Sequence, residues 1–339
     1  MNKVFIIAEA GANHNRNFEQ ALSLIDIAVQ SGADAVKFQT YSAKTLYASN
    51  TPDFAGYSNI NKLINDIELP RAWQYELKTY CDDVGIEFMS TPFDEQAVDE
   101  LVAVGVKRFK VSGFEATDPR IVKKVASTHL PMIVSVGIGT NLKMIEVILE
   151  WITDMNPNPD VTFLHCNHAY PTPYSDINLS NITLLKNHKF IKQVKIGLSD
   201  HTRGILVPPV AVALGACTIE KHFTISRKLP GPDHPFAIEP GELESMVKNI
   251  RSVEECMRTK NGQVTESEKN FIKATRAVVS TIDLAVGEKI TPDTVTTKRP
   301  FLEDSVSALS YYDIISQNYF VKKDIKKDTV IKWDDIARE

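Results

Sequence analysis

The sequence contains little cysteine, and what there is does not form a framework. Only four cysteines occur among 339 residues, and no two of them stand in a CxxC pair. A disulfide-stabilised secreted scaffold depends on many paired cysteines within a short chain. We therefore expect reduced thiols in a cytoplasmic protein. The four are Cys81, Cys166, Cys217 and Cys256.

Long apolar runs are also missing. The longest apolar stretch, residues 205–219, is interrupted by Pro208 and Pro209 and is too short to span a bilayer. Near the start, a short apolar run is followed by Glu9, which predicts a buried strand rather than a signal peptide. These features indicate no association with a membrane.

An excess of charge of one sign is absent as well. The chain has 38 Lys+Arg and 43 Asp+Glu, giving a net charge of −5, which provides no electrostatic basis for nucleic acid as the main partner. A small anion needs only a local cluster of cations and is not excluded. Hydrophobic residues make up 43% and charged residues 24%, typical of a soluble globular chain rather than a disordered one or a coiled coil.

Short apolar runs alternate with segments of helical period from residue 4 to about residue 256. Eight such strand–helix units over roughly 250 residues predict a (β/α)8 TIM barrel. A doubly wound sheet is the alternative, but no GxGxxG follows the first strand. The expected strands are 4–8, 35–38, 86–89, 108–111, 132–134, 161–164, 194–196 and 218–220.

The helices between these strands have recognisable starts and ends. Asp94, Asp118 followed by Pro119, Asn141 and Pro240 stand where helices are expected to begin. Glycine is frequent just after a helix, because it adopts the left-handed conformation easily. The glycines near expected helix ends are Gly32, Gly85, Gly105 and Gly215.

The pattern changes after the barrel. We assign residues 1–260 to the catalytic barrel, the polar stretch 261–280 to a linker and 281–339 to a second domain with short strands and frequent turns. About 60 residues make a small core for an independent domain. The second domain is therefore expected to pack against another surface.

The C-terminal ends of the barrel strands carry polar residues throughout, and catalytic groups lie at these ends in this fold. Lys37 and Lys110 stand inside apolar strands, where an unpaired lysine is rare. With the hydroxyls of Thr91, Ser135 and Ser199, they form a set that suits a phosphate or carboxylate. Each serine alone is more often a loop or cap residue. A Schiff-base role for either lysine is the chemical alternative.

Two histidines are the main metal candidates. His201 and His222 follow adjacent strands, so both imidazoles should lie at one mouth of the barrel. Two histidines with open positions suit Mn²⁺ or a similar divalent ion that must also hold substrate and water. The alternative is that both are hydrogen-bonded structural histidines. His14, His165 and His168 compete on the same rim, and His234 is expected in a loop.

At these residues the sequence resembles the sialic acid (N-acetylneuraminate) synthases. The resemblance covers nearly the whole chain, and its motifs are specific as a set. They are residues 6–14 (IIAEAGANH), 32–40 (GADAVKFQT), 90–93 (STPF), 170–173 (YPTP), 197–202 (GLSDHT), 220–224 (EKHFT), 230–234 (PGPDH) and 298–300 (KRP).

The resemblance implies a phosphoenolpyruvate-dependent, metal-dependent synthase of a nine-carbon sugar acid. It also implies a C-terminal SAF (type III antifreeze-like) domain and a domain-swapped homodimer. Glu9, His201 and His222 would be catalytic, with the two histidines holding Mn²⁺, or Mg²⁺ or Co²⁺ as alternatives. The implied phosphoenolpyruvate contacts are Lys37, Thr91, Lys110, Ser135 and Ser199, and the implied sugar contacts are Gln39, Glu115, Tyr170, Asp233 and Arg299.

Three positions depart from the family pattern. Gly113 stands where a serine is usual after Lys110, His168 replaces a small polar residue before the Tyr-Pro-Thr motif, and Phe301 replaces a glycine. They place the identity of the sugar in question more than the reaction class. Besides an N-acylmannosamine, the substrate alternatives are the diacetamido hexoses of legionaminic or pseudaminic acid synthesis. A Schiff-base aldolase and a catalytically inactive, sugar-binding relative are the other hypotheses.

Overall fold

A computed structural model describes residues 3–53, 56, 58–138, 141–189, 194–258 and 262–339. The chain divides into two compact units, Met1–Arg258 and Thr259–Glu339. The boundary predicted between 260 and 261 falls on residues outside the described set. Among the described residues, none of the helices combines the length and the apolar character needed to cross a bilayer.

The first unit is the predicted barrel of eight parallel strands. The strands follow the order β3-β2-β1-β8-β7-β6-β5-β4, and the two ends of this series, β3 and β4, lie against each other. All eight expected strands are present, with their ends shifted by at most four residues. They are β1 (Phe5–Glu9), β2 (Ala35–Thr40), β3 (Glu87–Pro92), β4 (Phe109–Val111), β5 (Met132–Val136), β6 (Val161–Cys166), β7 (Lys195–Asp200) and β8 (Thr218–His222).

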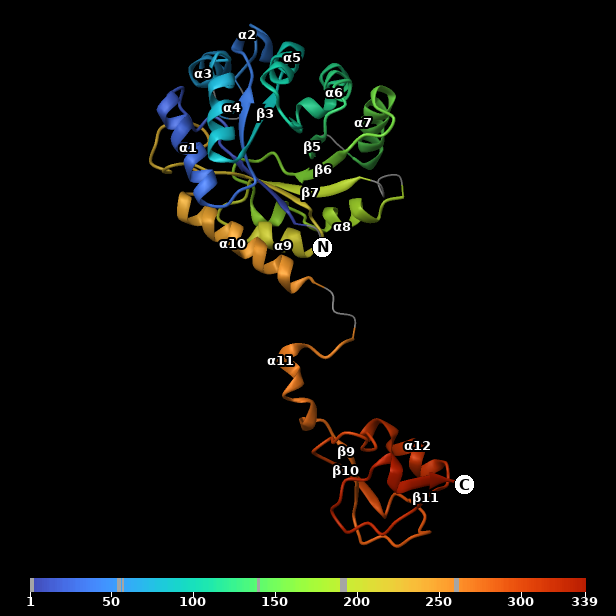
Figure 1. The fold of residues 1–339 in the computed structure, drawn as a ribbon. Helices are drawn as coiled ribbons and strands as arrows, with labels where there is room; N and C mark the ends of the chain where they lie inside the picture. Colours follow the sequence, from blue (N-terminus) through green and yellow to red (C-terminus); the bar gives the residue numbers. More distant parts are fainter. Residues whose placement is uncertain (1–2, 54–55, 57, 139–140, 190–193, 259–261) are drawn as a thin grey trace. The chain divides into compact units, whose positions relative to one another are not determined.

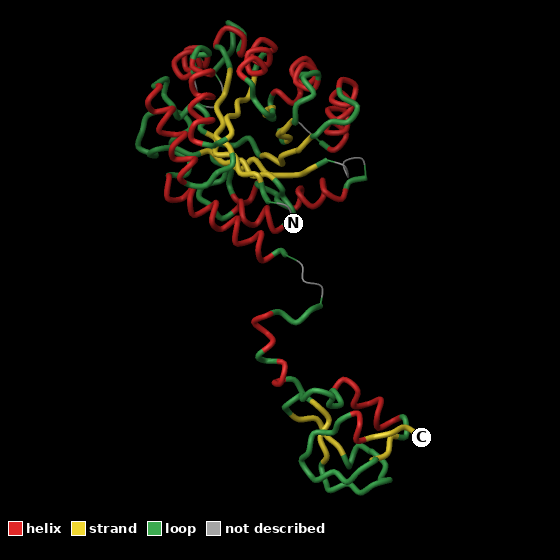
Figure 2. The backbone as a smooth tube through the Cα atoms, viewed as in Figure 1, coloured by secondary structure: helices red, strands yellow, loops and turns green. Residues whose placement is uncertain are grey.

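Helices surround the strands (Figures 1 and 2). The α-helices are α1 (Phe18–Gln30), α2 (Ala43–Leu46), α3 (Ile60–Ile67), α4 (Trp73–Val84), α5 (Glu95–Val104), α6 (Pro119–Ala126), α7 (Leu142–Met155), α8 (Ser180–Asn187), α9 (Val207–Ala213) and α10 (Pro240–Cys256). Two short 3₁₀ turns, η1 (Glu115–Thr117) and η2 (Tyr174–Asp176), follow β4 and β6.

The predicted helix boundaries are confirmed by their capping contacts. The side chains of Asp94, Asp118 and Asn141 each accept a hydrogen bond from a backbone N–H of the first turn, satisfying a donor that the helix leaves free. Gly85 and Gly105 end α4 and α5 with φ of 80° and 85°, a conformation that other residues adopt only with strain.

The alternation of side chains along the strands builds the floor of the site. Successive residues of a strand face opposite sides, so in β1 Ile6 and Ala8 pack under the helices while Ile7 and Glu9 face the interior. One layer of apolar side chains closes the interior of the barrel. The side chains that line the cavity come two residues later in the same strands. That layer consists of Ile7, Ala35, Met89, Ile133 and Leu164.

The second unit has its own small core and is rich in loops (Figure 2). Its elements are α11 (Glu266–Lys269), η3 (Ile272–Ala274), β9 (Ala277–Ser280), β10 (Val295–Lys298), η4 (Ala308–Ser310), α12 (Tyr311–Ser316), β11 (Tyr319–Val321), η5 (Trp333–Asp335) and β12 (Ile336–Arg338). The strand β9 falls within the predicted linker 261–280. This end of the linker assignment is wrong, because all four residues of β9 are buried and pair with β10.

Candidate active site

A cavity of about 250 Å³ lies at the C-terminal ends of the barrel strands, and every strand contributes to its lining. Except for Glu115 and Arg299, all of the predicted site residues line it. They are Glu9, Lys37, Gln39, Thr91, Lys110, Ser135, Tyr170, Ser199, His201, His222 and Asp233. The strand-end positions recognised in the sequence therefore converge on one space.

Two lysines and two carboxylates form a buried cluster at the base of this cavity. Lys37 Nζ lies 2.8 Å from Glu9 Oε2 and 3.7 Å from Glu220 Oε2. Lys110 Nζ lies 3.5 Å from the other oxygen of Glu220. Glu220 thus lies between two cations, and all four side chains are almost fully buried. Such a buried cluster is costly unless each charge has a partner. A bound anion would give each of the two lysines a further partner of opposite charge.

Hydroxyl groups surround the cations. Lys37 Nζ donates to Thr91 Oγ1 at 3.0 Å, and Ser199 Oγ donates to Glu220 Oε1 at 3.1 Å. Ser135 Oγ is buried and has no hydrogen-bond partner among the described residues. Buried polar groups nearly always have partners, so an unpaired hydroxyl in a cavity that two lysines also line indicates a ligand oxygen.

The protonation of the cluster follows from burial and charge together. Burial raises the pKa of Glu9 to about 7, against the opposing effect of Lys37. For Lys37, burial lowers the pKa, but the carboxylates of Glu220 and Glu9 outweigh it and the pKa is raised. Burial lowers the pKa of Lys110. With its pKa near 7, Glu9 is partly protonated near neutral pH, which reduces the negative charge beside Lys37 and favours a bound anion there.

His201 and His222 lie side by side at the mouth, with ring centroids 5.4 Å apart. Burial lowers the pKa of His201 to about 3 and that of His222 well below its usual value. Both imidazoles are therefore neutral, which is the form that binds a metal. His201 Nδ1 bonds the carbonyl of Asn167 at 2.6 Å, a contact that leaves Nε2 with its lone pair.

The residues present fit a metal held by two histidines. His222 Nδ1 is buried without a hydrogen-bond partner among the described residues, and Asp233 Oδ2 lies 3.7 Å away. No group of three or more His, Cys, Asp or Glu side chains in the described part of the chain is arranged to hold a metal. Such an ion would take its other ligands from water and substrate.

The competing histidines have structural partners. His14 Nδ1 accepts from the backbone of Arg16, His165 bonds the carbonyl of Ile177 at 2.6 Å, and His234 bonds Thr224 Oγ1 at 2.6 Å. Of these candidates, only His168 lines the cavity.

Of the five predicted sugar contacts, three line the cavity and two do not. Gln39 donates to Glu9 Oε1 at 2.8 Å, and the Tyr170 ring lies 4.2 Å from that of His201. Asp233 Oδ2 accepts from the backbone N–H of Ala12 at 3.3 Å. Glu115, in η1 behind the lining residue Ser112, accepts a hydrogen bond from that serine and does not itself line the cavity. Arg299 lies in the second unit.

Two features of the cavity were not predicted from the sequence. One is Glu220, whose position in β8 was noted without a role. The other is an aliphatic wall from α3, in the long connection between β2 and α4. Its residues recur at helical spacing, a signal that could have revealed the helix. They are Ile60, Leu63, Ile64 and Ile67.

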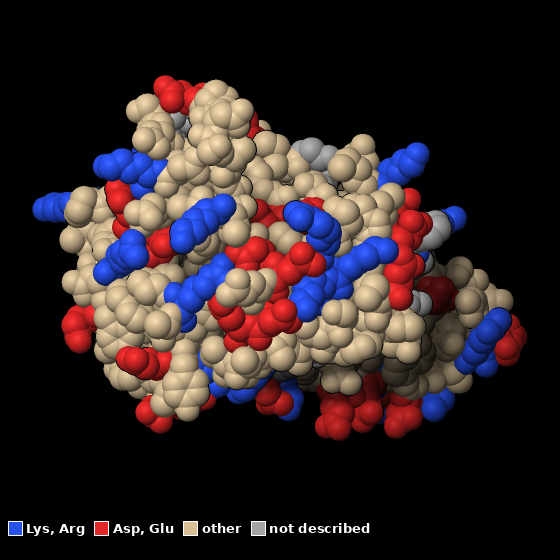
Figure 3. Space-filling view, turned by 90° about the horizontal axis from the view of Figure 1, so that it is seen from above, with Lys and Arg blue, Asp and Glu red and all other residues tan. Residues whose placement is uncertain are grey.

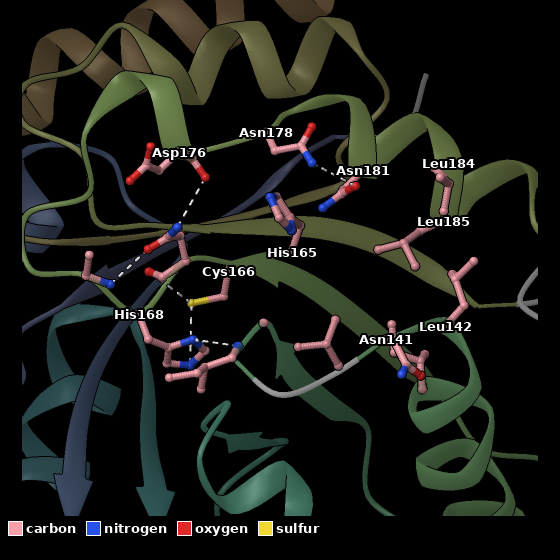
Figure 4. Close-up of a pocket in the computed structure, with 16 residues that line it drawn as sticks. Asn141, Leu142, His165, Cys166, His168, Asp176, Asn178, Asn181, Leu184 and Leu185 are labelled. Carbon is pink, nitrogen blue, oxygen red and sulfur yellow. Dashed lines mark hydrogen bonds between the residues drawn. The ribbon is translucent and has the colours of Figure 1, made fainter.

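A second cavity of about 750 Å³ lies beside the first, between the segments that follow β5 and β6 (Figure 4). Asn141, Asn178 and Asn181 line it together with leucines, and no Lys or Arg is among its described lining residues. It therefore lacks the cations that an anionic substrate needs. Cys166 and His168 line both cavities.

One face of the molecule shows how its charged side chains are distributed. On the face shown in Figure 3, acidic and basic groups are intermingled. This face presents no broad basic area of the kind that nucleic acid requires. The two lysines that line the cavity, Lys37 and Lys110, are buried.

Comparisons with known proteins agree with this geometry. The family model described as the NeuB family matches residues 24–262, and that of the SAF domain matches residues 275–337. The chain belongs to the NeuB family. The predicted resemblance to sialic acid synthases and the predicted C-terminal SAF domain are thereby confirmed.

Relatives of this NeuB-family chain match over almost its whole length. It is 38% identical to an uncharacterised protein of Methanocaldococcus jannaschii, over 98% of this chain and 94% of the relative. It is 36% identical to the N,N'-diacetyllegionaminic acid synthase of Legionella pneumophila, with the same coverage. The crystal structure of the N-acetylneuraminic acid synthetase of Leptospira borgpetersenii, in complex with citrate, is 32% identical, with a TM-score of 0.73 over 80% of this chain and 91% of that one.

Proposed function

We propose that the protein is a nonulosonic acid synthase, which condenses phosphoenolpyruvate with an N-acylmannosamine-type sugar. The products are a nine-carbon 2-keto-3-deoxy sugar acid and phosphate. The observation that carries the proposal is that two buried lysines, the unpaired hydroxyl of Ser135 and two neutral histidines line one cavity. The names of the relatives supply the class of product.

The lysines would hold phosphoenolpyruvate. Its phosphate and carboxylate together need several donors, and the base of the cavity has Lys37, Lys110, Thr91, Ser135 and Ser199. Hydrogen bonds between charged partners in a buried site are strong and fix orientation. The substrate would replace part of the contact that both lysines make with Glu220 and leave the enol carbon facing the histidines.

The carbon–carbon bond would form between the enol carbon C3 of phosphoenolpyruvate and the aldehyde carbon of the open-chain sugar. His201 and His222 would hold a divalent metal, Mn²⁺ in our proposal, whose chemistry when bound is to polarise a carbonyl oxygen. Gln39, Tyr170 and Asp233 would orient the sugar. The two histidines would remain neutral throughout, since burial favours that form.

Glu9 would handle the water that completes the reaction. After C3 has attacked, C2 is electron-poor, and water adding there gives a tetrahedral carbon that expels phosphate. A general base with a pKa near the working pH suits this step, and the pKa of Glu9 is raised to about 7 by burial. Lys37, 2.8 Å away, would stabilise the ionised form.

The aliphatic wall of α3 favours a second candidate sugar. A fully hydroxylated chain beside Ile60, Leu63, Ile64 and Ile67 would leave hydroxyl groups without partners, which is costly in a buried site. The methyl groups of a diacetamido-dideoxy hexose would instead pack against these side chains. This sugar corresponds to the legionaminic type of product named for the Legionella relative.

Purified protein with phosphoenolpyruvate, Mn²⁺ and a panel of acylated hexosamines tests the function. We expect phosphate release that requires both sugar and metal, and a higher kcat/KM for the diacetamido sugar than for N-acetylmannosamine if the α3 wall selects it. Trapping of pyruvate with borohydride on Lys37 or Lys110 would instead support the Schiff-base aldolase. Sugar binding without turnover would support the inactive relative.

Replacing Lys110 with methionine should raise the KM for phosphoenolpyruvate about 100-fold, because loss of one partner of a buried charge pair costs about 2–5 kcal/mol. Steady-state kinetics measures the change. The matched control is Lys195→Met, since Lys195 is exposed at the start of β7 and pairs with Asp160. An unchanged KM in Lys110→Met would contradict the assignment of Lys110 to the phosphate.

The SAF domain is proposed to act across a domain-swapped homodimer, where Arg299 would contact the sugar's N-acyl group. We expect light scattering to give twice the chain mass. We also expect Arg299→Ala to raise the KM for the sugar about tenfold, as loss of one charged hydrogen bond would, and to leave the KM for phosphoenolpyruvate unchanged. A monomer with full activity would exclude this arrangement.

A further inference from the structure

Two of the departures from the family pattern, Gly113 and His168, meet in space. A Cβ atom on Gly113 would overlap Nε2 and Cε1 of the His168 imidazole. A Cβ on Gly137 would overlap the carbonyl oxygen of Cys166 before it came within 2.8 Å of the same ring. The imidazole therefore fills the space that a side chain at position 113 would occupy, and Gly113 makes room for it.

The hydrogen bonds of the ring determine which nitrogen carries its proton. His168 Nδ1 accepts from the backbone N–H of Ile138 at 3.2 Å (Figure 4). The neutral imidazole has one donor and one acceptor nitrogen, so Nε2 carries the hydrogen. This Nε2 lies 3.9 Å from Cys166 Sγ, a weak acceptor. The ring is further packed against Phe114, with centroids 4.6 Å apart.

The position of His168 along the barrel places this donor among the predicted phosphate contacts. Strands β4, β5 and β7 supply Lys110, Ser135 and Ser199 to the cavity. Strand β6 lies between β5 and β7 and ends at Cys166, and His168 follows it two residues later and lines the same cavity. The imidazole thus occupies the place in this series that would otherwise lack a phosphate donor.

We propose that His168 donates a hydrogen bond from Nε2 to the phosphate of phosphoenolpyruvate, in place of a hydroxyl at position 113, and that Gly113 is required to accommodate the ring. This inference rests on the proposed function. It makes positions 113 and 168 an interdependent pair: histidine requires glycine opposite it, and serine at 113 requires a smaller residue at 168. A neutral imidazole suffices, because the donor is an N–H group.

Four proteins test the pair: the natural chain, His168→Asn, Gly113→Ser and the double variant. Binding of phosphoenolpyruvate is measured by calorimetry and folding by thermal unfolding. His168→Asn should weaken binding about tenfold, because the amide of the shorter side chain would not reach the phosphate and one hydrogen bond to a charged group would be lost. Gly113→Ser should weaken it more, because the serine displaces the ring. The double variant should recover to within about threefold of the natural chain, by the logic of coupled neighbours.

Inhibition constants identify the end of the substrate that His168 contacts. Inorganic phosphate should inhibit His168→Asn about tenfold more weakly than the natural chain, and pyruvate should inhibit both equally. A change for pyruvate alone would overturn the assignment to phosphate. Unchanged binding in His168→Asn, or a double variant no better than Gly113→Ser, would overturn the proposal. His188→Asn, on the barrel exterior beside Glu146, is the control.

The test separates this inference from the proposed function. If the natural chain binds phosphoenolpyruvate and turns it over while His168→Asn behaves identically, only the role of His168 is wrong. If the natural chain neither binds phosphoenolpyruvate nor releases phosphate with any sugar, the proposed function itself fails. His168→Asn adds no bulk and is expected to fold. It therefore tests the role of His168 even if Gly113→Ser fails to fold.

Discussion

Replacing His201 with alanine is expected to lower kcat at least about 1000-fold, since a metal that polarises a carbonyl contributes several kcal/mol to the barrier and each 1.36 kcal/mol is tenfold in rate. His222→Ala should have the same effect. The ring centroids of the two histidines lie 5.4 Å apart. Since these two side chains are the proposed protein ligands of the metal, a single substitution removes half of them. Chelation of the natural protein should abolish phosphate release, and added Mn²⁺ should restore it.

Metal binding provides a measurement that is independent of turnover. Mn²⁺ titrated into the natural protein should bind with a stoichiometry of one per chain, by calorimetry or by loss of the free-ion resonance signal, and His201→Ala should bind it far more weakly. The matched control is His188→Ala, which removes an imidazole from the barrel exterior. Full activity of His201→Ala, or of the chelated protein, would exclude the metal assignment.

The second large effect is expected at Glu9. Glu9→Gln keeps the shape of the side chain and a carbonyl oxygen that can accept from Gln39, but it cannot accept a proton. General-base catalysis contributes about 100- to 10,000-fold, and we expect a loss of kcat in this range. The KM for phosphoenolpyruvate should change little, because Lys37 retains Glu220 at 3.7 Å as its counter-ion.

The pH dependence follows from the direction of the pKa shift. Burial raises the pKa of Glu9 to about 7, so below this pH the carboxyl is protonated and cannot act as a base. The kcat/KM of the natural protein should therefore rise with pH through about 7 and then level off. The residual activity of Glu9→Gln should lack this rising limb of the pH profile.

A matched carboxylate separates this role from a general effect of charge. Glu87 lies at the start of β3, at the opposite end of the barrel strands, and pairs with Arg108 at 2.6 Å. Glu87→Gln should keep both the rate and the pH limb. If Glu9→Gln retained the limb, the titration would belong to another group and Glu9 would not be the base.

Much of the fold could be predicted because its determinants are local. The eight apolar runs, the capping side chains of Asp94, Asp118 and Asn141, and the glycines after the helices each act within a few residues of sequence. Parallel strands of a barrel also bring their C-terminal ends together. Polar residues at those ends could therefore be assigned to one site before any distance was known.

The sequence alone did not show which side chains of β8 face the cavity. Glu220, Lys221 and His222 are consecutive polar residues, and the sequence does not state which of them face inwards. Their alternation points Glu220 and His222 into the cavity, while Lys221 pairs with Asp200 at 2.6 Å. Glu220 contacts both buried lysines, Lys37 and Lys110, a relation across three strands that no local pattern contains.

Local sequence patterns were enough to predict the barrel and the strand-end groups that suit an anion and a metal, because periodicity, capping and strand-end position are properties of short segments. The SAF domain was implied by the family motifs. The contacts between these groups, in contrast, became visible only in the folded chain. Lys37 and Lys110 share one carboxylate, α3 forms an aliphatic wall, and His168 fills the space left by Gly113. Each of these depends on distances between segments far apart in the chain.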